Sequence, residues 1–323
     1  AKYFPNSPKA KALTHVPGAA ITVTEALKEW LSYTEPKVQH STFIGYRRAV
    51  INVLIPSFGQ LMLAKLTRGH IKNWIAEQST SVKRINNVLT PLRGMLEEAH
   101  EDGVIESNPM EGLKVRKRER LEQSEHTIDP FSPEEIAAIV SECDGQFLNL
   151  VQFAFWTGLR TSEMIGLEWK HIDWIKGLVM VRQSFVMGKM KVTKTRSGRR
   201  DVKLLHPARE ALERQREYTE HIGDRVFHDP RTNEPWQGDK PIREWNWRPA
   251  LKRARVRYRY PYQTRHTYAS TMLSAGENIA WLSSQLGHGT VSMTMRAYAR
   301  WIPDVDPKAG EKAAELWIKN KQD

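Results

Sequence analysis

The sequence has few of the features that define several common classes of protein. Its 323 residues include a single cysteine, Cys143, which excludes an internal disulfide framework and a cysteine-rich zinc site. No uninterrupted apolar run approaches the roughly 18 residues of a membrane span. No charged and then apolar leader opens the chain. We therefore expect a protein of the reducing cytoplasm that neither spans nor binds a membrane.

Two kinds of catalytic motif are also missing. No cluster of aspartates and glutamates has metal-ligand spacing, which argues against a two-metal nuclease. No GxxxxGK(S/T) loop is present, so chemistry driven by a nucleotide has no visible site. We expect the protein to need no metal and no nucleotide cofactor.

Positive charge is abundant. There are 49 lysines and arginines against 37 aspartates and glutamates, which gives a net charge of +12 and an isoelectric point of about 9.7. The excess lies in segments that also carry aromatic residues, such as residues 243–265, so nucleic acid is the first candidate partner. We expect Trp245 and Trp247 to pack in the core and most arginines of this segment to face DNA. A basic protein that binds nothing acidic is the alternative.

The first third of the chain reads as a small all-helical domain. Residues 1–20 have no sustained period and predict a flexible lead-in, and residues 21–113 carry helical periodicity. The predicted helix signals are Thr22 with Glu25 as a capping box, Ser41 and Thr67 as N-caps, and a long helix from about Thr80 to His100 with a kink at Pro91.

A highly charged run at residues 114–129 predicts a linker. Ser132, Pro133 and Glu135 then restart a helix, and the second domain is expected at residues 130–303. It combines helices with β segments at residues 172–186 and 191–205, with a turn at Lys176 and Gly177. The overall prediction is a mainly α fold with a small antiparallel β-sheet. The tail, residues 304–323, predicts a short amphipathic helix that packs on its own domain or docks on a neighbouring subunit.

Four stretches of the second domain carry polar residues that are unremarkable singly. These are TGLRTSE at 157–163, TKTRSGRR at 193–200, YQTRHTYAS at 262–270 and LGHGTVSMTMRAY at 286–298. Alone, each is most often an ion pair, an edge charge or a core stripe. In order they supply Arg, Lys, Arg, His and Tyr. A tyrosine hydroxyl, with a free pKa of about 10, attacks a phosphate only if cations clamp that phosphate and a donor protonates the leaving oxygen.

Together these stretches resemble the motifs of the tyrosine recombinase (phage integrase) family. The match is carried by Arg160, Lys194, Arg265, His288 after Leu286 and Gly287, and Tyr298. The resemblance implies a site-specific DNA recombinase, the integrase of a phage or integrative element. Such an enzyme cleaves and rejoins strands through a covalent 3′-phosphotyrosine intermediate. For the fold, it implies an all-helical SAM-like core-binding domain followed by a mixed α+β catalytic domain.

The resemblance also implies a role for each matched residue. Arg160 and Arg265 hold the scissile phosphate, His288 donates a bond to it, Tyr298 attacks, and Lys194 protonates the leaving 5′ oxygen. No cofactor takes part in this scheme.

One position departs from the family pattern. The family usually has histidine three residues before the second arginine, where this chain has Tyr262. We expect Tyr262 to donate a bond to the phosphate instead. Glu163 is expected to orient Arg160 through a charge-assisted bond. His266 is expected either to support the site or to be a buried histidine with no catalytic part.

Further cations are expected to contact the DNA backbone, with a solvated surface as the alternative. They are Arg47, Arg48, Lys83, Arg84, Lys191, Arg196, Arg199, Arg200, Arg255 and Arg257. The expected partners are double-stranded DNA attachment sites bound by a homotetramer in the nucleoid of a bacterial host. A directionality factor and a host DNA-bending protein are further expected partners. Integrases that the N-terminal stretch resembles often carry an arm-binding domain upstream, and this sequence begins without methionine.

Two other functions fit the same motifs. A type IB topoisomerase uses the same phosphotyrosine chemistry as a monomer that relaxes DNA. A non-catalytic DNA-binding protein could keep the fold without the reaction, but it would not need Tyr298.

Overall fold

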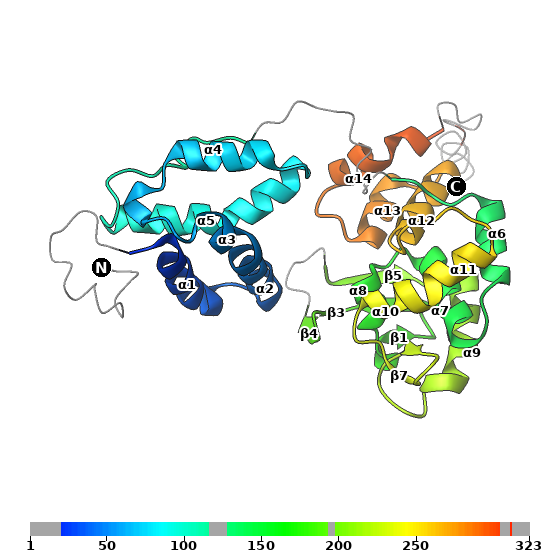
Figure 1. The fold of residues 1–323 in the computed structure, drawn as a ribbon. Coiled ribbons are helices and arrows are strands. Elements are labelled where there is room, and N and C mark those ends of the chain that lie inside the picture. Colours follow the sequence, from blue (N-terminus) through cyan, green and yellow to red (C-terminus); the bar gives the residue numbers. More distant parts are fainter. Residues whose placement is uncertain (1–20, 116–127, 193–197, 304–310, 312–323) are drawn as a thin grey trace, which may run out of the picture. The chain divides into compact units, whose positions relative to one another are not determined.

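The computed structural model describes residues 21–115, 128–192, 198–303 and 311, which form two compact units (Figure 1). The first unit comprises residues 21–115, and the second begins at residue 128. The predicted lead-in, most of the predicted linker, Lys194, Arg196 and nearly all of the tail lie outside the described residues. Within the described ranges, every helix is too short or too polar to cross a membrane.

The first unit is built from helices, as its periodicity predicts. They are α1 (Val23–Thr34), α2 (His40–Ala49), α3 (Ile55–Phe58), α4 (Arg68–Glu77) and α5 (Val82–Glu101). A π-helical segment, Val50–Leu54, joins α2 to α3, and 3-10 turns lie at Glu35–Lys37 and Leu63–Lys65.

The helix starts of this unit test the N-cap predictions. Thr22 and Glu25 exchange reciprocal bonds at the start of α1, which confirms the predicted capping box. Thr67 likewise accepts from the backbone N–H of His70 at the start of α4. The predicted cap at Ser41 is wrong, because α2 begins one residue earlier, after Gln39 and without a side-chain cap. The long helix α5 begins after Ser81 and continues through Pro91.

One apolar core holds this unit together. Leu27, Leu89 and Leu92 are fully buried in it, and α5 packs closely on α1. A Cβ atom at Gly94 would lie 2.8 Å from the Trp30 ring, so the absence of a side chain permits this close helix contact.

The second unit mixes helices with short antiparallel strands (Figure 1). Its helices are α6 (Pro133–Ser141), α7 (Gly145–Thr157), α8 (Thr161–Ile165), α9 (His206–Thr219), α10 (Asp239–Pro241), α11 (Arg248–Arg253), α12 (Gln263–Ser274), α13 (Ile279–Leu286) and α14 (Val291–Tyr298). Its strands are β1 (Ile172–Asp173), β2 (Leu178–Val181), β3 (Gln183–Val186), β4 (Lys189–Val192), β5 (Arg200–Lys203), β6 (His228–Asp229) and β7 (Glu234–Pro235).

The strands confirm the predicted antiparallel β structure. They pair in the order β1-β2-β5, with β3-β4 and β6-β7 as separate hairpins. Gly177, with a φ of 62°, lies in the predicted turn between β1 and β2. In the three-stranded sheet Val179 lies opposite Val202, and both are fully buried. The sheet therefore packs one face into the core of this unit.

Two helix ends, those of α7 and α13, meet at α12, which carries one of the motifs. The predicted turn at Thr157 and Gly158 ends α7, and Gly158 has a φ of 62°. A Cβ atom there would lie 2.5 Å from the Tyr268 ring of α12, so glycine is required both for the turn and for this packing. Gly287 ends α13 in the same left-handed conformation, with a φ of 66°. Each turn presents a backbone carbonyl, that of Gly158 or that of Leu286, to the Arg265 side chain of α12.

Candidate active site

Arg265 lies at the centre of the candidate active site. Its side chain is buried on α12, and its guanidinium donates to the carbonyl of Gly158 at 2.7 Å and of Leu286 at 2.6 Å. Both carbonyls lie at helix C-termini, where unpaired backbone oxygens attract a cation. Burial and the charge of Arg160 lower the pKa of Arg265 to about 10, so the group stays charged at neutral pH. Arg265 thus joins α7, α12 and α13 around a fixed positive charge.

Glu163 holds Arg160 in place. Arg160 precedes α8, and its Nη1 donates to Glu163 Oε1 at 2.7 Å, as expected. The other carboxylate oxygen accepts from the backbone N–H of Arg160 at 2.9 Å. Burial alone would raise the pKa of Glu163, but Arg200 and Arg160 lower it to about 2. The carboxylate is therefore ionised, while the Arg160 side chain keeps 36% of its surface exposed.

The prediction that Arg200 contacts DNA is wrong. Its guanidinium is buried and forms a bidentate pair with Glu163, at 3.0 and 2.9 Å, and its Nε donates to the carbonyl of Gln285 at 2.6 Å. The strand pattern contained the signal, because Arg200 shares the inward face of β5 with the fully buried Val202. Arg200 is thus a buried partner of Glu163 that the sequence interpretation missed.

Tyr298, the last residue of α14, lies near Arg265 and Arg160. The side chain is 2% exposed, and its Oη lies 2.6 Å from Nδ1 of His266. Burial raises the pKa of Tyr298 to about 12, although Arg265 and Arg160 act in the opposite direction. The resting phenol is therefore protonated. Its ring also lies parallel to that of His288, with centroids 6.4 Å apart.

His288 follows the turn at Gly287. Its Nδ1 lies 2.7 Å from Oγ1 of Thr294, a fully buried residue of α14. Burial, together with Arg265 and Arg160, lowers the pKa of His288 to about 4, so the ring is neutral at neutral pH. If the hydroxyl of Thr294 donates to Nδ1, the proton of the ring lies on Nε2, which is then a hydrogen-bond donor.

Tyr262 lies just before α12 and is 43% exposed. Tyr262 lies near Arg160 and, after Glu163, helps to raise the pKa of its guanidinium against the effect of burial. Its ring meets the ring of His266 edge to face, with centroids 5.1 Å apart. Tyr262, which stands where the family usually has a histidine, therefore lies beside both Arg160 and His266.

The structure thus brings eight residues together in one cluster. Seven of them were predicted for the site: Arg160, Glu163, Tyr262, Arg265, His266, His288 and Tyr298. The eighth is Arg200, which was expected on DNA. Lys194 lies outside the described residues.

Most cations that were expected on DNA lie at the surface of their own unit. Arg47 and Arg48 are exposed on α2, and Lys83 and Arg84 are exposed in the first turn of α5. In the second unit the exposed members are Arg199, Arg255 and Arg257, while Lys191 is half-buried. Arg257 forms an ion pair with Asp129. Contact of these residues with DNA stays a prediction, and Arg196 lies outside the described residues.

The basic aromatic segment at residues 243–265 only partly follows its prediction. Trp247 is buried as expected, and its indole donates to the carbonyl of Arg259 at 2.7 Å. Trp245 is 63% exposed, so its assignment to the core is wrong. Arg259 pairs with Asp129 and Glu135 instead of facing outward, because its guanidinium is largely buried beside those carboxylates.

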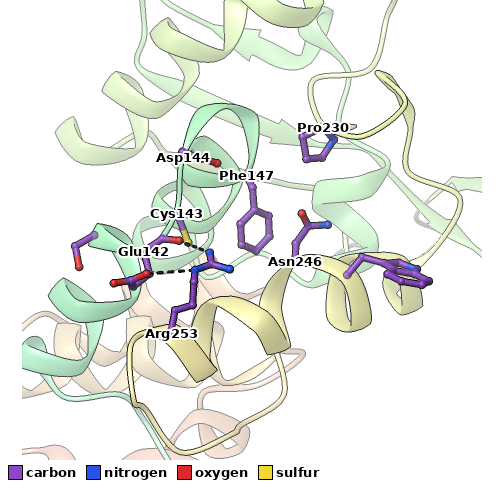
Figure 2. A pocket seen from close by; sticks show the side chains of 9 residues that line it. Glu142, Cys143, Asp144, Phe147, Pro230, Asn246 and Arg253 are labelled. Carbon is purple, nitrogen blue, oxygen red and sulfur yellow. Dashed lines mark hydrogen bonds and ion pairs between the residues drawn. The ribbon is translucent and has the colours of Figure 1, made fainter.

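A separate pocket of about 510 Å³ lies between α6, α7 and α11 and contains none of the candidate site residues (Figure 2). Arg253 crosses it to bind Glu142, and Cys143 lines its wall. Burial raises the pKa of the Cys143 thiol to about 12, so this thiol is not a nucleophile at neutral pH. Among the described residues, no group of three or more His, Cys, Asp or Glu side chains is arranged to hold a metal ion.

Comparison with known proteins identifies the family and the fold of this chain. Residues 130–302 match the model of the phage integrase family, and residues 22–78 match the N-terminal SAM-like domain of phage integrases. The prophage integrase IntR of Escherichia coli K12 is 31% identical over 83% of this chain and 67% of its own length. In structure, the Tn1549 transposon integrase, solved with a circular intermediate DNA, has a TM-score of 0.72 at 18% identity, covering 92% of this chain and 99% of its own. A lambda integrase tetramer bound to a Holliday junction has a TM-score of 0.69 at 15% identity, covering 93% and 83%.

The chain belongs to the phage integrase family of tyrosine recombinases. It is therefore an enzyme of DNA cleavage and rejoining, and the expected site-specific recombination is confirmed at the level of the family. The expected fold, a SAM-like helical domain followed by a mixed α+β domain, is confirmed as well.

Proposed function

We propose that the protein recombines specific DNA attachment sites to integrate or excise a mobile element, with Tyr298 as its nucleophile. The observation that carries this proposal is the buried hydroxyl of Tyr298 beside Arg265 and His288. A tyrosine surrounded by fixed cations and neutral hydrogen-bonding rings has the environment that attack on a phosphodiester requires.

The proposed reaction gives each group one role. Arg160 and Arg265 bind the non-bridging oxygens of one scissile phosphate and stabilise the charge that grows in its transition state. His288 donates from Nε2 to the same phosphate, and Tyr262 adds a second neutral donor. Tyr298 attacks in line and forms a 3′-phosphotyrosine ester, while Lys194 protonates the departing 5′ oxygen. The ester keeps the bond energy, so a 5′ hydroxyl from a partner strand reverses the step without a cofactor.

The proposed partner is double-stranded DNA in an assembly of several subunits. Residues 21–113 would bind the core site, residues 130–303 would carry the catalysis, and residues 304–323 would dock on a subunit. The relatives named for prophage integration and the tetramer of lambda integrase on a Holliday junction support a homotetramer on paired sites. A directionality factor, a host bending protein and association with the nucleoid belong to the same proposal.

A trapping assay tests the chemistry. A nicked duplex that carries the element's own attachment site loses a short strand after cleavage, so the covalent intermediate accumulates. We expect a protein-DNA adduct on a denaturing gel with chelator present. If the protein binds this duplex but forms no adduct, the phosphotyrosine proposal fails and a non-catalytic DNA-binding protein takes its place.

A second assay separates recombination from relaxation. A recombinase joins strands of two different duplexes, whereas a type IB topoisomerase only relaxes a supercoiled circle. We expect joint products from two labelled attachment sites. Relaxation without any joint product would favour the topoisomerase.

Lys194→Ala should lower the rate of cleavage by about 100-fold or more, because a general acid typically contributes 10²- to 10⁴-fold. A substrate with sulfur in place of the bridging 5′ oxygen should restore most of this loss, since a thiolate leaves without a proton. The measurement is the rate of adduct formation on both substrates. An equal defect on both would remove the general-acid role from Lys194.

Tyr262→His should retain cleavage activity or raise it by a few fold. The imidazole would restore the family's usual residue, and Arg160 would keep its bond to Glu163. Single-turnover cleavage on the nicked duplex measures the effect. Complete loss of cleavage with normal DNA binding would show that the tyrosine hydroxyl has a role that imidazole cannot fill.

A further inference from the structure

His266 makes the closest contact with the nucleophile among the described residues. Its Nδ1 lies 2.6 Å from the hydroxyl oxygen of Tyr298, which is the length of a strong hydrogen bond. The two residues belong to different helices, because His266 follows Arg265 on α12 and Tyr298 ends α14. The Tyr262 ring supports the imidazole edge to face.

The protonation states give this bond a direction. Burial and the neighbouring Arg265 lower the pKa of His266 to about 4, so its ring is neutral at neutral pH. Tyr298, with a pKa of about 12, keeps its proton. The phenol must therefore donate and Nδ1 must accept, which leaves the ring proton on Nε2.

We propose that His266 is a catalytic residue that takes the phenol proton of Tyr298 during cleavage and returns it during rejoining. This inference rests on the proposed function of Tyr298. As the bond between Oη and phosphorus forms, the proton passes from Oη to Nδ1, and the bond between phosphorus and the 5′ oxygen breaks. On rejoining, the 5′ hydroxyl attacks, the ester bond breaks and the proton returns to Oη.

The other groups around the phenol are poorly suited to this task. Arg160, Arg200 and Arg265 carry no acceptor. Nδ1 of His288 is already bonded to Thr294, and its ring lies parallel to that of Tyr298. Tyr262 stands where the family usually has a histidine. His266 thus supplies an imidazole that position 262 lacks.

The proton must move while the new bond forms. The pKa of Tyr298 lies far above that of His266, so transfer before attack is strongly uphill. Bonding to phosphorus makes the phenol oxygen far more acidic, and the transfer then becomes favourable. A phosphate bound beside Arg265 also offsets the positive charge that lowers the pKa of His266.

The test combines two substitutions at the contact. His266→Asn keeps an oxygen acceptor near the position of Nδ1 but cannot hold a proton, and we expect adduct formation to slow by about 100-fold. Replacing Tyr298 with 3,5-difluorotyrosine gives a more acidic phenol, which loses its proton more easily without a base. In that background the defect of His266→Asn should shrink to less than about 10-fold, because a more acidic phenol depends less on general-base catalysis.

His288→Asn is the matched control, because His288 stacks on Tyr298 without bonding to its hydroxyl. Its defect should be the same with tyrosine and with difluorotyrosine. Both variants must bind the nicked duplex normally, and His266→Gln replaces His266→Asn if the latter does not fold. A defect of His266→Asn that difluorotyrosine leaves unchanged, an equal rescue of both variants, or no defect at all would each overturn the proposal. Absence of an adduct from the unmodified protein would instead contradict the proposed function.

Discussion

Tyr298→Phe is expected to abolish the covalent adduct, with a loss of at least about 10⁴-fold in cleavage, because no other group replaces a missing nucleophile. Removing the hydroxyl also removes its hydrogen bond to His266, which costs about 1 kcal/mol of folding stability. DNA affinity should change little, since surface cations dominate contacts with the phosphate backbone. Trapping on the nicked duplex and a binding titration at one salt concentration measure the two effects.

Tyr260→Phe is the control for this experiment. Tyr260 is 43% exposed, and its ring packs against Tyr258 outside the cluster around Arg265. This variant should form the adduct at the normal rate. An adduct of unchanged yield from Tyr298→Phe would assign the nucleophile to another residue.

Glu163→Gln should have the largest effect on stability. The substitution leaves the guanidinium of Arg200 buried without its carboxylate, and breaking such a pair costs about 3–5 kcal/mol. It also releases Arg160, so cleavage should fall even where the protein remains folded. Urea unfolding of the variant and of the original protein measures the free-energy difference.

Two comparisons separate the buried pair from ordinary charge effects. Glu213→Gln breaks an exposed pair with Arg209 and should cost less than about 1 kcal/mol. Adding Arg200→Met to Glu163→Gln removes the unpaired charge and should restore most of the lost stability without restoring cleavage. A double variant as unstable as Glu163→Gln alone would show that an unpaired Arg200 is not the cause.

Acid should remove the contribution of Glu163. Its folded pKa of about 2 lies below the ordinary value of 4.5, so the folded state favours the ionised carboxylate. That preference contributes about 3 kcal/mol above pH 4.5 and is lost as the pH falls toward 2. The difference in unfolding free energy between the protein and Glu163→Gln should therefore narrow below pH 4.5. A difference that stays constant down to pH 3 would contradict a depressed pKa.

The features that the sequence predicted well are local ones. The capping boxes at Thr22 and Ser132 and the turns at Gly158 and Gly177 all depend on residues within a few positions of each other. The cap expected at Ser41 is an exception, because α2 begins at His40 without a side-chain cap. Short-range hydrogen bonds and steric limits act within each segment before it packs. Caps and turns can therefore be predicted from the amino-acid sequence of the segment alone.

The motifs predicted the family, which the comparisons confirm, and they proposed Arg160, Arg265, His288 and Tyr298 as site residues. Only the tertiary structure decided that Arg200 is a buried partner of Glu163, 37 residues away, and that His266 contacts Tyr298, 32 residues away. Whether a basic or aromatic side chain faces solvent or a carboxylate depends on which distant element packs over it. Chain folding sets that arrangement through the burial of the whole unit. The alternation of β5 places Arg200 on the same face as Val202, but it does not say which carboxylate Arg200 meets.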